Sequence, residues 1–341
     1  MHLLLALLLC MPSWQDASAL WAAGDRRGAL SAAESALAER PDDAALRLTY
    51  GTWLLELQRP AAALEALAPM DARADSLRGS SLYLLARYEE ALPLLDPADP
   101  LQTLMIVDSL LALARTDEVD AALARATEAL GVHNPRVLAL RGRMLAAQGR
   151  HADAVPLFRD ALAGDPLDRQ ALFGLGQSLV RSGARDEGLA VLMRHREVLP
   201  LLDARDFALQ ALALDPSHAP HHAQLGDIAR SLGLVDAAIA RYEQAASLAA
   251  PDELAPIVLR HARLLVEDAD ALDDALDRLA SAAARVQDVR LPVRAGDLLV
   301  AAGRPGEALE HYRLALTWRP DDARIKTRIE DAARAATEHA R

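Results

Sequence analysis

The residues of this sequence best suited to chemistry are the histidines of the segment 218–222. His218 and His222 are four residues apart, a spacing that places two imidazoles on one helix face, as in two-histidine metal sites. Asp215 and Asp227 lie nearby in the sequence. Pro220 separates the two histidines, however, and favours a helix that only begins there. We therefore expect a solvated helix start, with metal binding as the alternative, and assign no metal ligand.

No other set of residues is arranged for catalysis. The sequence has no glycine-rich phosphate loop, no Gly-x-Ser-x-Gly motif and no spaced Cys/His cluster. Cys10 is the only cysteine, which excludes an intramolecular disulfide and a cysteine-based metal site. Acidic pairs are expected at helix starts or on helix surfaces, where the helix dipole favours them. The pairs are Asp42-Asp43, Asp273-Asp274 and Asp321-Asp322. The sequence therefore predicts a protein that is not an enzyme and has no cofactor.

The elements that carry these residues are predicted to be helices. Hydrophobic residues make up 52% of the chain but aromatic residues only 4%, and alanine and leucine dominate. Alanine and leucine favour helices, whereas sheets favour β-branched and aromatic residues. The 17 glycines and 18 prolines are spread along the chain, as expected for breaks between short helices.

Three kinds of landmark recur at the same interval of 34 residues. The pairs are Gly142 and Gly176, Ala154 and Gly188, and Pro166 and Pro200. One copy reads Leu138, Gly142, Leu145, Gly149, Ala154, Phe158, Ala161 and Pro166; the next reads Leu172, Leu175, Gly176, Leu179, Gly183, Gly188, Leu192 and Pro200. This pattern resembles the tetratricopeptide repeat family, which has this period. The resemblance implies an all-α fold: a right-handed superhelical solenoid of antiparallel helix pairs.

Packing explains why these residue types recur. Gly142, Gly176 and Gly226 lack a side chain, so the two helices of a copy can approach closely. A second set of glycines falls where the first helix must stop, because glycine tolerates a left-handed cap; its members are Gly149, Gly183, Gly233 and Gly303. Pro166, Pro200 and Pro320 are expected to end the second helix, since proline removes a hydrogen-bond donor. Gly188 departs from the family pattern, which prefers alanine.

Less regular copies extend the resemblance over nearly the whole chain. They are marked by Gly51 and Ala63, Gly79 and Ala91, Ala122 and Ala126, Gly226 and Ala238, Arg263 and Ala275, and Gly296 and Ala308, after a half-copy at Gly28–Pro41. The interval from Gly176 to Gly226 is one period plus 16 residues, which predicts an additional helix over Leu201–Leu214. The expected organisation is a signal peptide at 1–19, a repeat block at 20–200, an extra helix at 201–216, a second repeat block at 217–322 and a capping helix at 323–341.

In the tetratricopeptide repeat family, the first helices line a concave groove that binds partner segments, and the resemblance implies such a groove here. Its predicted residues are Arg136, Arg143, Gln170, Phe173, Gln177, Arg181, Asp227, Arg230, Arg290 and Asp297. Arg136, Arg143 and Arg181 could form a basic path for a carboxylate or acidic segment; ordinary solvated arginines are the alternative. The Lys/Asn arrangement of chaperone-type carboxylate clamps is missing, because Ala139 and Arg143 stand at the corresponding positions. That specificity is therefore not transferred.

The formal net charge of −12 argues against a nucleic-acid binder. At the N-terminus, the apolar run Leu3–Leu9 and the sequence Ala17-Ser18-Ala19 resemble a secretory signal cleaved after Ala19. The alternative is a first cytoplasmic helix over Leu3–Ala23. No other segment approaches the roughly 20 apolar residues of a membrane span. We expect an exported protein, periplasmic or secreted, with a cytoplasmic location as the alternative.

These observations favour a non-catalytic protein–protein interaction scaffold that binds a protein or peptide segment in its groove. Two alternatives stay open. One is a metal-binding or metal-regulated envelope protein that uses the His218–His222 cluster. The other is the repeat subunit of an enzyme complex. The sequence does not identify the partner or the oligomeric state.

Overall fold

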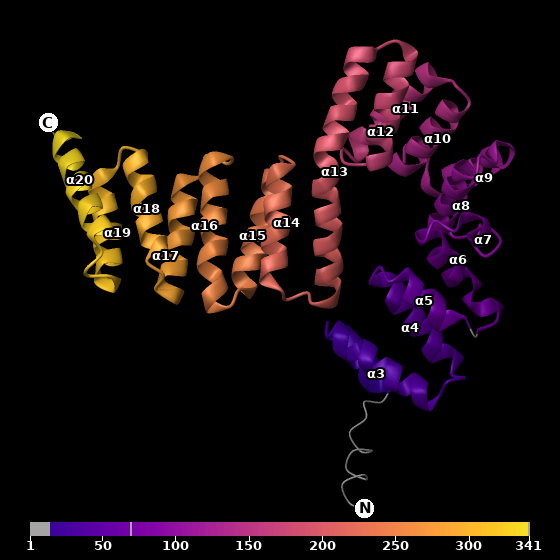
Figure 1. Ribbon diagram of the computed structural model, residues 1–341, viewed down its shortest axis with the longest axis horizontal. Coiled ribbons are helices and arrows are strands. Elements are labelled where there is room, and N and C mark those ends of the chain that lie inside the picture. The colour runs from indigo at the N-terminus through magenta and orange to yellow at the C-terminus, as the bar shows by residue number, and fades with distance from the viewer. Residues whose placement is uncertain (1–13, 69, 340–341) are drawn as a thin grey trace, which may run out of the picture. The chain divides into compact units, whose positions relative to one another are not determined.

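The computed structural model describes residues 14–68 and 70–339 (Figure 1). In this part of the chain the structure consists of α-helices, α2 to α20, and one short 3-10 helix, η1, without a strand. From α2 to α12, and again from α14 to α20, each helix packs against its neighbour in sequence. The predicted all-α solenoid of helix pairs is confirmed.

The chain divides into two compact units, which share the long helix α13 (Arg185–Leu214). The first unit comprises residues up to Leu202 and Ala213–Asp215, and the second comprises Asp203–Leu212 and Pro216–Arg341. The first contains α2 (Trp14–Ala22), α3 (Arg26–Glu39), α4 (Ala44–Glu56), α5 (Pro60–Leu67), η1 (Ala72–Ala74), α6 (Asp75–Leu84), α7 (Tyr88–Ala91), α8 (Pro100–Ala112), α9 (Thr116–Leu130), α10 (Pro135–Ala147), α11 (His151–Gly164) and α12 (Arg169–Ser182). The second contains α14 (Ala219–Ser231), α15 (Val235–Leu248), α16 (Pro251–Glu267), α17 (Leu272–Val286), α18 (Arg290–Ala301), α19 (Pro305–Trp318) and α20 (Ala323–His339).

Side-chain caps fix where several first helices begin. Asp43 accepts a hydrogen bond from the backbone N–H of Leu46 at the start of α4, and Asp168 accepts one from Ala171 at the start of α12. Such caps satisfy backbone donors that have no partner within the helix. The acidic pair at 42–43 was predicted at a helix start, and Asp43 confirms this.

The two helices of a pair approach closely where a glycine of the first helix faces an aromatic residue that lies sixteen positions later, on the second helix. A Cβ atom added to Gly142 would lie 2.9 Å from the Phe158 ring, and one added to Gly296 would lie 2.5 Å from the Tyr312 ring. Gly226 and Tyr242 form the same pair at 3.1 Å. The aromatic side chain of the second helix thus occupies the space that a side chain on the first helix would need. The predicted packing role of Gly142 and Gly226 is confirmed.

The turn inside each pair has the same backbone conformation throughout the described chain. In each pair, one residue of the first helix marks the repeat and is called the landmark here; the residue seven positions after it lies in the turn and has a positive φ. The landmarks are Ala17, Gly51, Gly79, Val107, Gly142, Gly176, Gly226, Arg263 and Gly296; the turn residues are Gly24, Gln58, Ala86, Ala114, Gly149, Gly183, Gly233, Asp270 and Gly303. Left-handed turns at the four predicted glycines are confirmed. Ala17 also shows that the expected half-copy at Gly28–Pro41 is a complete pair, α2 and α3.

The helix end predicted at Pro200 is wrong. Helix α13 runs through this proline, so the segment 201–214 continues α13 and is not a separate helix. A proline inside a helix costs about 3 kcal/mol. Val198 and Leu202 on either side are buried, and burying one such side chain stabilises by about 1.5–3 kcal/mol. Packing on both sides of Pro200 thus offsets the lost hydrogen bond.

The structure describes the C-terminal helix as far as His339, whereas at the other end its description begins at Trp14. The apolar run Leu3–Leu9 and Cys10 lie outside the described residues. The predicted cleavage point after Ala19 falls within α2, where Ala17 is fully buried. At the other end, α20 buries Ile325 and Ala332 in a core cluster with α19, as a capping helix requires.

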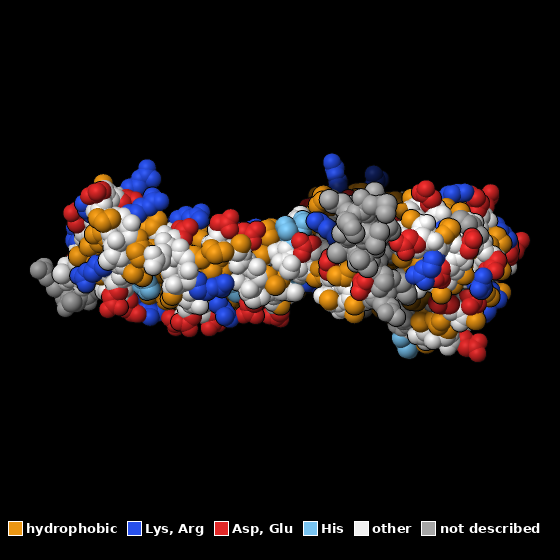
Figure 2. All heavy atoms as spheres, turned by 90° about the horizontal axis from the view of Figure 1, so that it is seen from below, with side chains coloured by type: hydrophobic (Ala, Val, Ile, Leu, Met, Phe, Trp, Pro, Cys, Tyr) orange, Lys and Arg blue, Asp and Glu red, His pale blue; other side chains and the backbone are white. Residues whose placement is uncertain are grey.

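Charges of both signs are interspersed on the face shown in Figure 2, which does not present one continuous basic surface. Such a mixture is typical of a solvated protein surface and differs from the basic stripe of a general nucleic-acid binder. None of the helices described has both the length and the apolar character that crossing a membrane demands.

Candidate partner-binding groove

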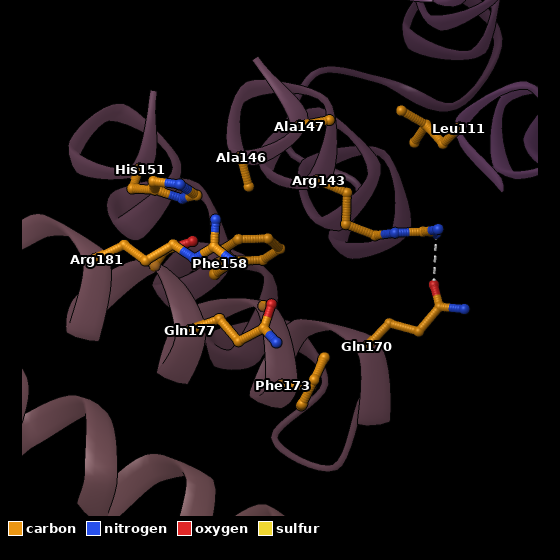
Figure 3. Close-up of a pocket in the computed structure, with 12 residues that line it drawn as sticks. Leu111, Arg143, Ala146, Ala147, His151, Phe158, Gln170, Phe173, Gln177 and Arg181 are labelled. Carbon is orange, nitrogen blue, oxygen red and sulfur yellow. Dashed lines mark hydrogen bonds between the residues drawn. The ribbon is translucent and has the colours of Figure 1, made fainter. Parts of the chain in front are cut away.

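A pocket of about 440 Å³ lies in the N-terminal unit and is lined by first helices of successive pairs, α8, α10 and α12, together with α11. It brings together five of the predicted groove residues. These are Arg143, Gln170, Phe173, Gln177 and Arg181. Figure 3 shows Arg181, Gln177 and His151 toward one end of the pocket and Arg143 with Gln170 toward the other.

The floor of this pocket is apolar and closely packed. Phe158 is fully buried beneath it, wedged against the glycine face of α10. Phe173 stands at the wall with 45% of its surface exposed. A large aromatic side chain exposed beside a concave apolar floor is an anchor of the kind found at protein interfaces.

Arg143 does not contribute a free cation to the pocket. Its guanidinium donates to the carboxylate of Asp108 on α8, and to Oε1 of Gln170 at 2.8 Å. Asp108 is nearly buried and also accepts a hydrogen bond from the Tyr83 hydroxyl at 2.7 Å. Burial and then the charge of Asp108 raise the pKa of Tyr83 above its ordinary value. The carboxylate thus neutralises Arg143 and ties α6, α8 and α10 together.

Arg181 is the cation at the other end of the pocket. Its side chain is exposed, and in the described part of the chain no carboxylate pairs with it. Two buried polar atoms near it, Ser178 Oγ and His151 Nδ1, lack a hydrogen-bond partner there. Buried polar atoms are nearly always satisfied in folded proteins. This end of the pocket therefore offers three groups that a bound polar or anionic side chain could satisfy.

A second pocket of about 280 Å³ continues the lining on α8, α10 and α12 and shares Gln170 with the first. Arg136 lies here, beside the buried side chains of Ala139 and Leu140 and the exposed Leu101. The predicted residues of the N-terminal unit therefore all line one of two adjoining pockets.

The remaining predicted groove residues lie in the C-terminal unit, and neither pocket includes them. Each already has charged partners. Asp227 pairs with Arg260, Arg230 with Glu267 and Asp268, Arg290 with Asp288, and Asp297 with Arg328. Because both Asp227 and Asp297 also accept a tyrosine hydroxyl, from Tyr242 and Tyr312, they link helices. A groove on this unit stays a prediction.

The histidine segment is arranged differently from the expected solvated helix start. Helix α14 begins at Ala219, so His218 precedes it as the N-cap, while His222 is only 3% exposed. Its Nε2 lies 2.9 Å from the carbonyl oxygen of Pro216. The expectation of solvation is therefore wrong for His222, because it packs under the first turn. Among residues 14–68 and 70–339, no group of three or more potential ligands is placed to hold a metal ion.

Sequence reasoning missed the residues that act through contacts between copies. Asp108, Tyr83, His151 and Ser178 lie on four different helices and were not singled out. One signal was available in the sequence. Asp108, Asp227 and Asp297 each directly follow the landmark residue of their first helix, and the copies of Asp227 and Asp297 carry a tyrosine sixteen residues after that landmark. The pairing of Asp108 with Tyr83 and Arg143 had no such signal, because it joins three copies.

Comparison with protein-family models gives three matches, each described as a tetratricopeptide repeat. They cover residues 20–83, residues 107–167 and 140–196, and residues 222–252. Together the matched segments make up more than half of the chain. A comparison with curated proteins gives no significant match.

Solved structures with similar folds include a chain of the APC/C hetero-tetramer Cut9-Hcn1, with a TM-score of 0.35 and 14% identity over 85% of this chain. The protein described here spans 64% of that chain. MamA from AMB-1 has a TM-score of 0.30 and 20% identity over 51% of this chain and 96% of its own. A thermophilic TPR protein of Thermus thermophilus has a TM-score of 0.24 and 21% identity over 69% of this chain and 99% of its own.

Proposed function

Because the chain belongs to the tetratricopeptide repeat family, we propose that it is a non-catalytic scaffold that binds a protein segment in the groove of α8, α10 and α12. The observation that carries this proposal is the 440 Å³ pocket, which combines an exposed aromatic anchor with polar groups that have no hydrogen-bond partner among the described residues. An extended or helical segment docking on stacked first helices would bury Phe173 and reach Arg181.

The charges at the two ends of the pocket suggest which side chains a bound segment would present to it. At one end, Arg143 is already paired with the carboxylate of Asp108, whereas Arg181 at the other end has no carboxylate partner among the described residues. An acidic side chain at Arg181, next to an apolar one on Phe173, would gain a charge-assisted hydrogen bond and bury apolar surface. The basic path expected over three arginines is thereby reduced to its Arg181 end, with Arg136 in the adjoining pocket.

The first prediction tests this groove by affinity capture from extracts of the source cells, followed by mass spectrometry. The double substitution Phe173→Ala and Arg181→Ala should reduce recovery of the specific partner at least about tenfold, because interface anchors of these types commonly contribute more than 1.4 kcal/mol. Circular dichroism should show unchanged helicity, since both side chains are exposed.

A matched control carries Leu314→Ala and Arg313→Ala on α19, an exposed hydrophobic residue beside an exposed arginine. It should capture the partner as the unaltered protein does. Equal recovery by all three proteins would reject the groove.

Arg143 is left unaltered, because Arg143→Glu would place a second carboxylate beside Asp108 and disturb the fold. Recovery of one dominant enzyme would identify the chain as the repeat subunit of an enzyme complex.

A further inference from the structure

A smaller pocket of about 210 Å³ lies in the C-terminal unit, among α15, α16 and α17. Second helices α15 and α17 contribute most of its polar lining, so it differs in construction from a groove of first helices. The polar residues that line it are Glu243, Ser247, His261, Arg278, Ser281 and Arg285. Leu254 and Val258 of α16, both buried, add an apolar base.

His261 is the unusual member of this set. It is only 1% exposed, its ring is stacked on Tyr242 with centroids 5.6 Å apart, and its Nε2 is buried without a hydrogen-bond partner in the described chain. A buried nitrogen without a hydrogen-bond partner destabilises the fold, and native proteins rarely leave one without a water or ligand. Burial, and then the positive charge of Arg278, lower the pKa of His261. The ring is therefore neutral near pH 7 and can donate one N–H.

The two arginines have different partners. Arg278 forms an ion pair with Glu243, which neutralises it. Arg285 donates only one long hydrogen bond, 3.3 Å, to the carbonyl oxygen of Ala246, and no carboxylate pairs with it among the residues described. The pocket thus has an excess of one positive charge. Ser247 and Ser281 also line it, and the Ser247 hydroxyl already donates to the carbonyl oxygen of Gln244 at 2.8 Å.

We propose that this pocket binds a small free oxyanion, a carboxylate or a phosphate. A guanidinium presents a planar fork of donors that suits both groups, and the Ser281 hydroxyl and a neutral imidazole can add hydrogen bonds without adding charge. The volume corresponds to roughly seven water molecules, which suits a small molecule better than a peptide segment. The inference does not depend on the proposed groove, since all its residues lie on α15, α16 and α17.

The test is a titration of the full chain, with ¹⁵N-labelled histidine, followed by long-range ¹H–¹⁵N spectra of the imidazole rings. Sodium phosphate and sodium acetate are added separately, with sodium chloride keeping the ionic strength constant. The His261 signals, identified by their loss in His261→Gln, should shift and saturate with one of the two anions. Which anion saturates distinguishes a phosphate ligand from a carboxylate ligand.

Two arginine variants make the result specific. Arg285→Ala should weaken the binding at least tenfold, while Arg241→Ala, which removes the same charge from α15 outside the pocket, should leave it within twofold. No saturable shift with either anion would show that only water occupies the pocket and would overturn the proposal. Equal binding by Arg285→Ala would overturn it as well, because the shift would then come from another site.

Discussion

At the scale of single residues, the turn inside each helix pair shows how a backbone requirement appears in the sequence. Five of the nine turn residues at positive φ are glycines. Four of these are predicted from the sequence, and Gly24 is not. Gln58, Ala86, Ala114 and Asp270 adopt the same conformation without that signal. A left-handed conformation costs an L-residue about 1–2 kcal/mol. These four residues accept the cost because the packed helices on either side fix the direction of the chain.

The second prediction concerns Ala114, an exposed turn residue with φ of 55°. Ala114→Gly should raise the free energy of unfolding by about 0.5–1 kcal/mol, since glycine adopts this conformation freely and only part of the gain is lost to unfolded-chain entropy. Urea denaturation measures the change. Gly149→Ala, the reverse substitution at the equivalent turn, should lower the same free energy by a similar amount. Destabilisation by Ala114→Gly would show that the turn is not strained.

The third prediction is a pH dependence carried by His261. Its folded-state pKa is lowered from 6.5 by burial and by Arg278, with a smaller opposing effect of Glu243. The unfolded chain therefore binds the proton more tightly, and stability is lost as the pH falls below about 6.5. Thermal denaturation between pH 7.5 and 5.5 should show a smaller fall in Tm for His261→Gln than for the unaltered protein. His133→Gln, at an exposed position, should retain the full fall; if His261→Gln does so too, another group carries the effect.

At the scale of helices, aspartates fasten one pair to the next. Asp108 joins Tyr83 and Arg143, Asp227 joins Tyr242 and Arg260, and Asp297 joins Tyr312 and Arg328. The pKa of each of the three tyrosines lies above its ordinary value. Burial is the largest cause, and the nearby carboxylate raises the pKa further. Each arginine lies on the helix that follows its aspartate's pair, which for Arg328 is the capping helix α20, so the carboxylate bridges the interface to the next element.

Much of the helix arrangement could be predicted from sequence because its signals are local. Glycine landmarks, turn glycines and capping aspartates act within one copy, and their spacing reveals them. The continuation of α13 through Pro200 could not be predicted, because it depends on the burial of Val198 and Leu202. The same holds for the pocket at Arg181: helical spacing predicts Phe173 and Arg181 on one face of α12, but His151 of α11 joins them only through packing of α11 against α12.

The fourth prediction explains why Gly188 departs from the family's alanine. A Cβ atom there would lie 2.7 Å from the backbone nitrogen of Val180 and 2.8 Å from the carbonyl oxygen of Gly176. Since backbone atoms cannot move aside as flexible side chains do, Gly188→Ala should lower the free energy of unfolding by about 1–3 kcal/mol. Gly306→Ala on α19, where an added Cβ meets nothing within 4 Å, is the control and should be neutral or slightly stabilising. Equal urea midpoints for the two variants would contradict the close approach.

At the scale of the whole molecule, the N-terminal helix pair bears on where the protein resides. Ala17 is fully buried in a core cluster with α3 and α4, and the Trp21 ring stacks on that of Trp53 with centroids 4.4 Å apart. Cleavage after Ala19 would retain the stacked tryptophans but remove Ala17 and much of α2. Export with cleavage after Ala19 would therefore remove part of the first helix pair. Export itself stays a prediction.

The fifth prediction is read from the intact mass of the native protein in separated cytosolic and envelope fractions. Export with cleavage after Ala19 gives a species that begins at Leu20 in the periplasmic or secreted fraction. Its first pair should be less stable than in the full-length chain, because Ala29 and Ala33 of α3 lose part of their cover. A full-length cytosolic species would contradict export and assign α2 a structural role.

The shortened copies in the N-terminal unit have a consequence for how the molecule opens. Helix α5 has eight residues and α7 has four, whereas isolated helices shorter than about 12–15 residues are marginal in water. These two helices depend on their neighbours for stability, and an opening there breaks few contacts. Amide hydrogens of α5 and α7 should therefore exchange with solvent sooner than those of α10 and α11, and a protease should cleave first within these two helices.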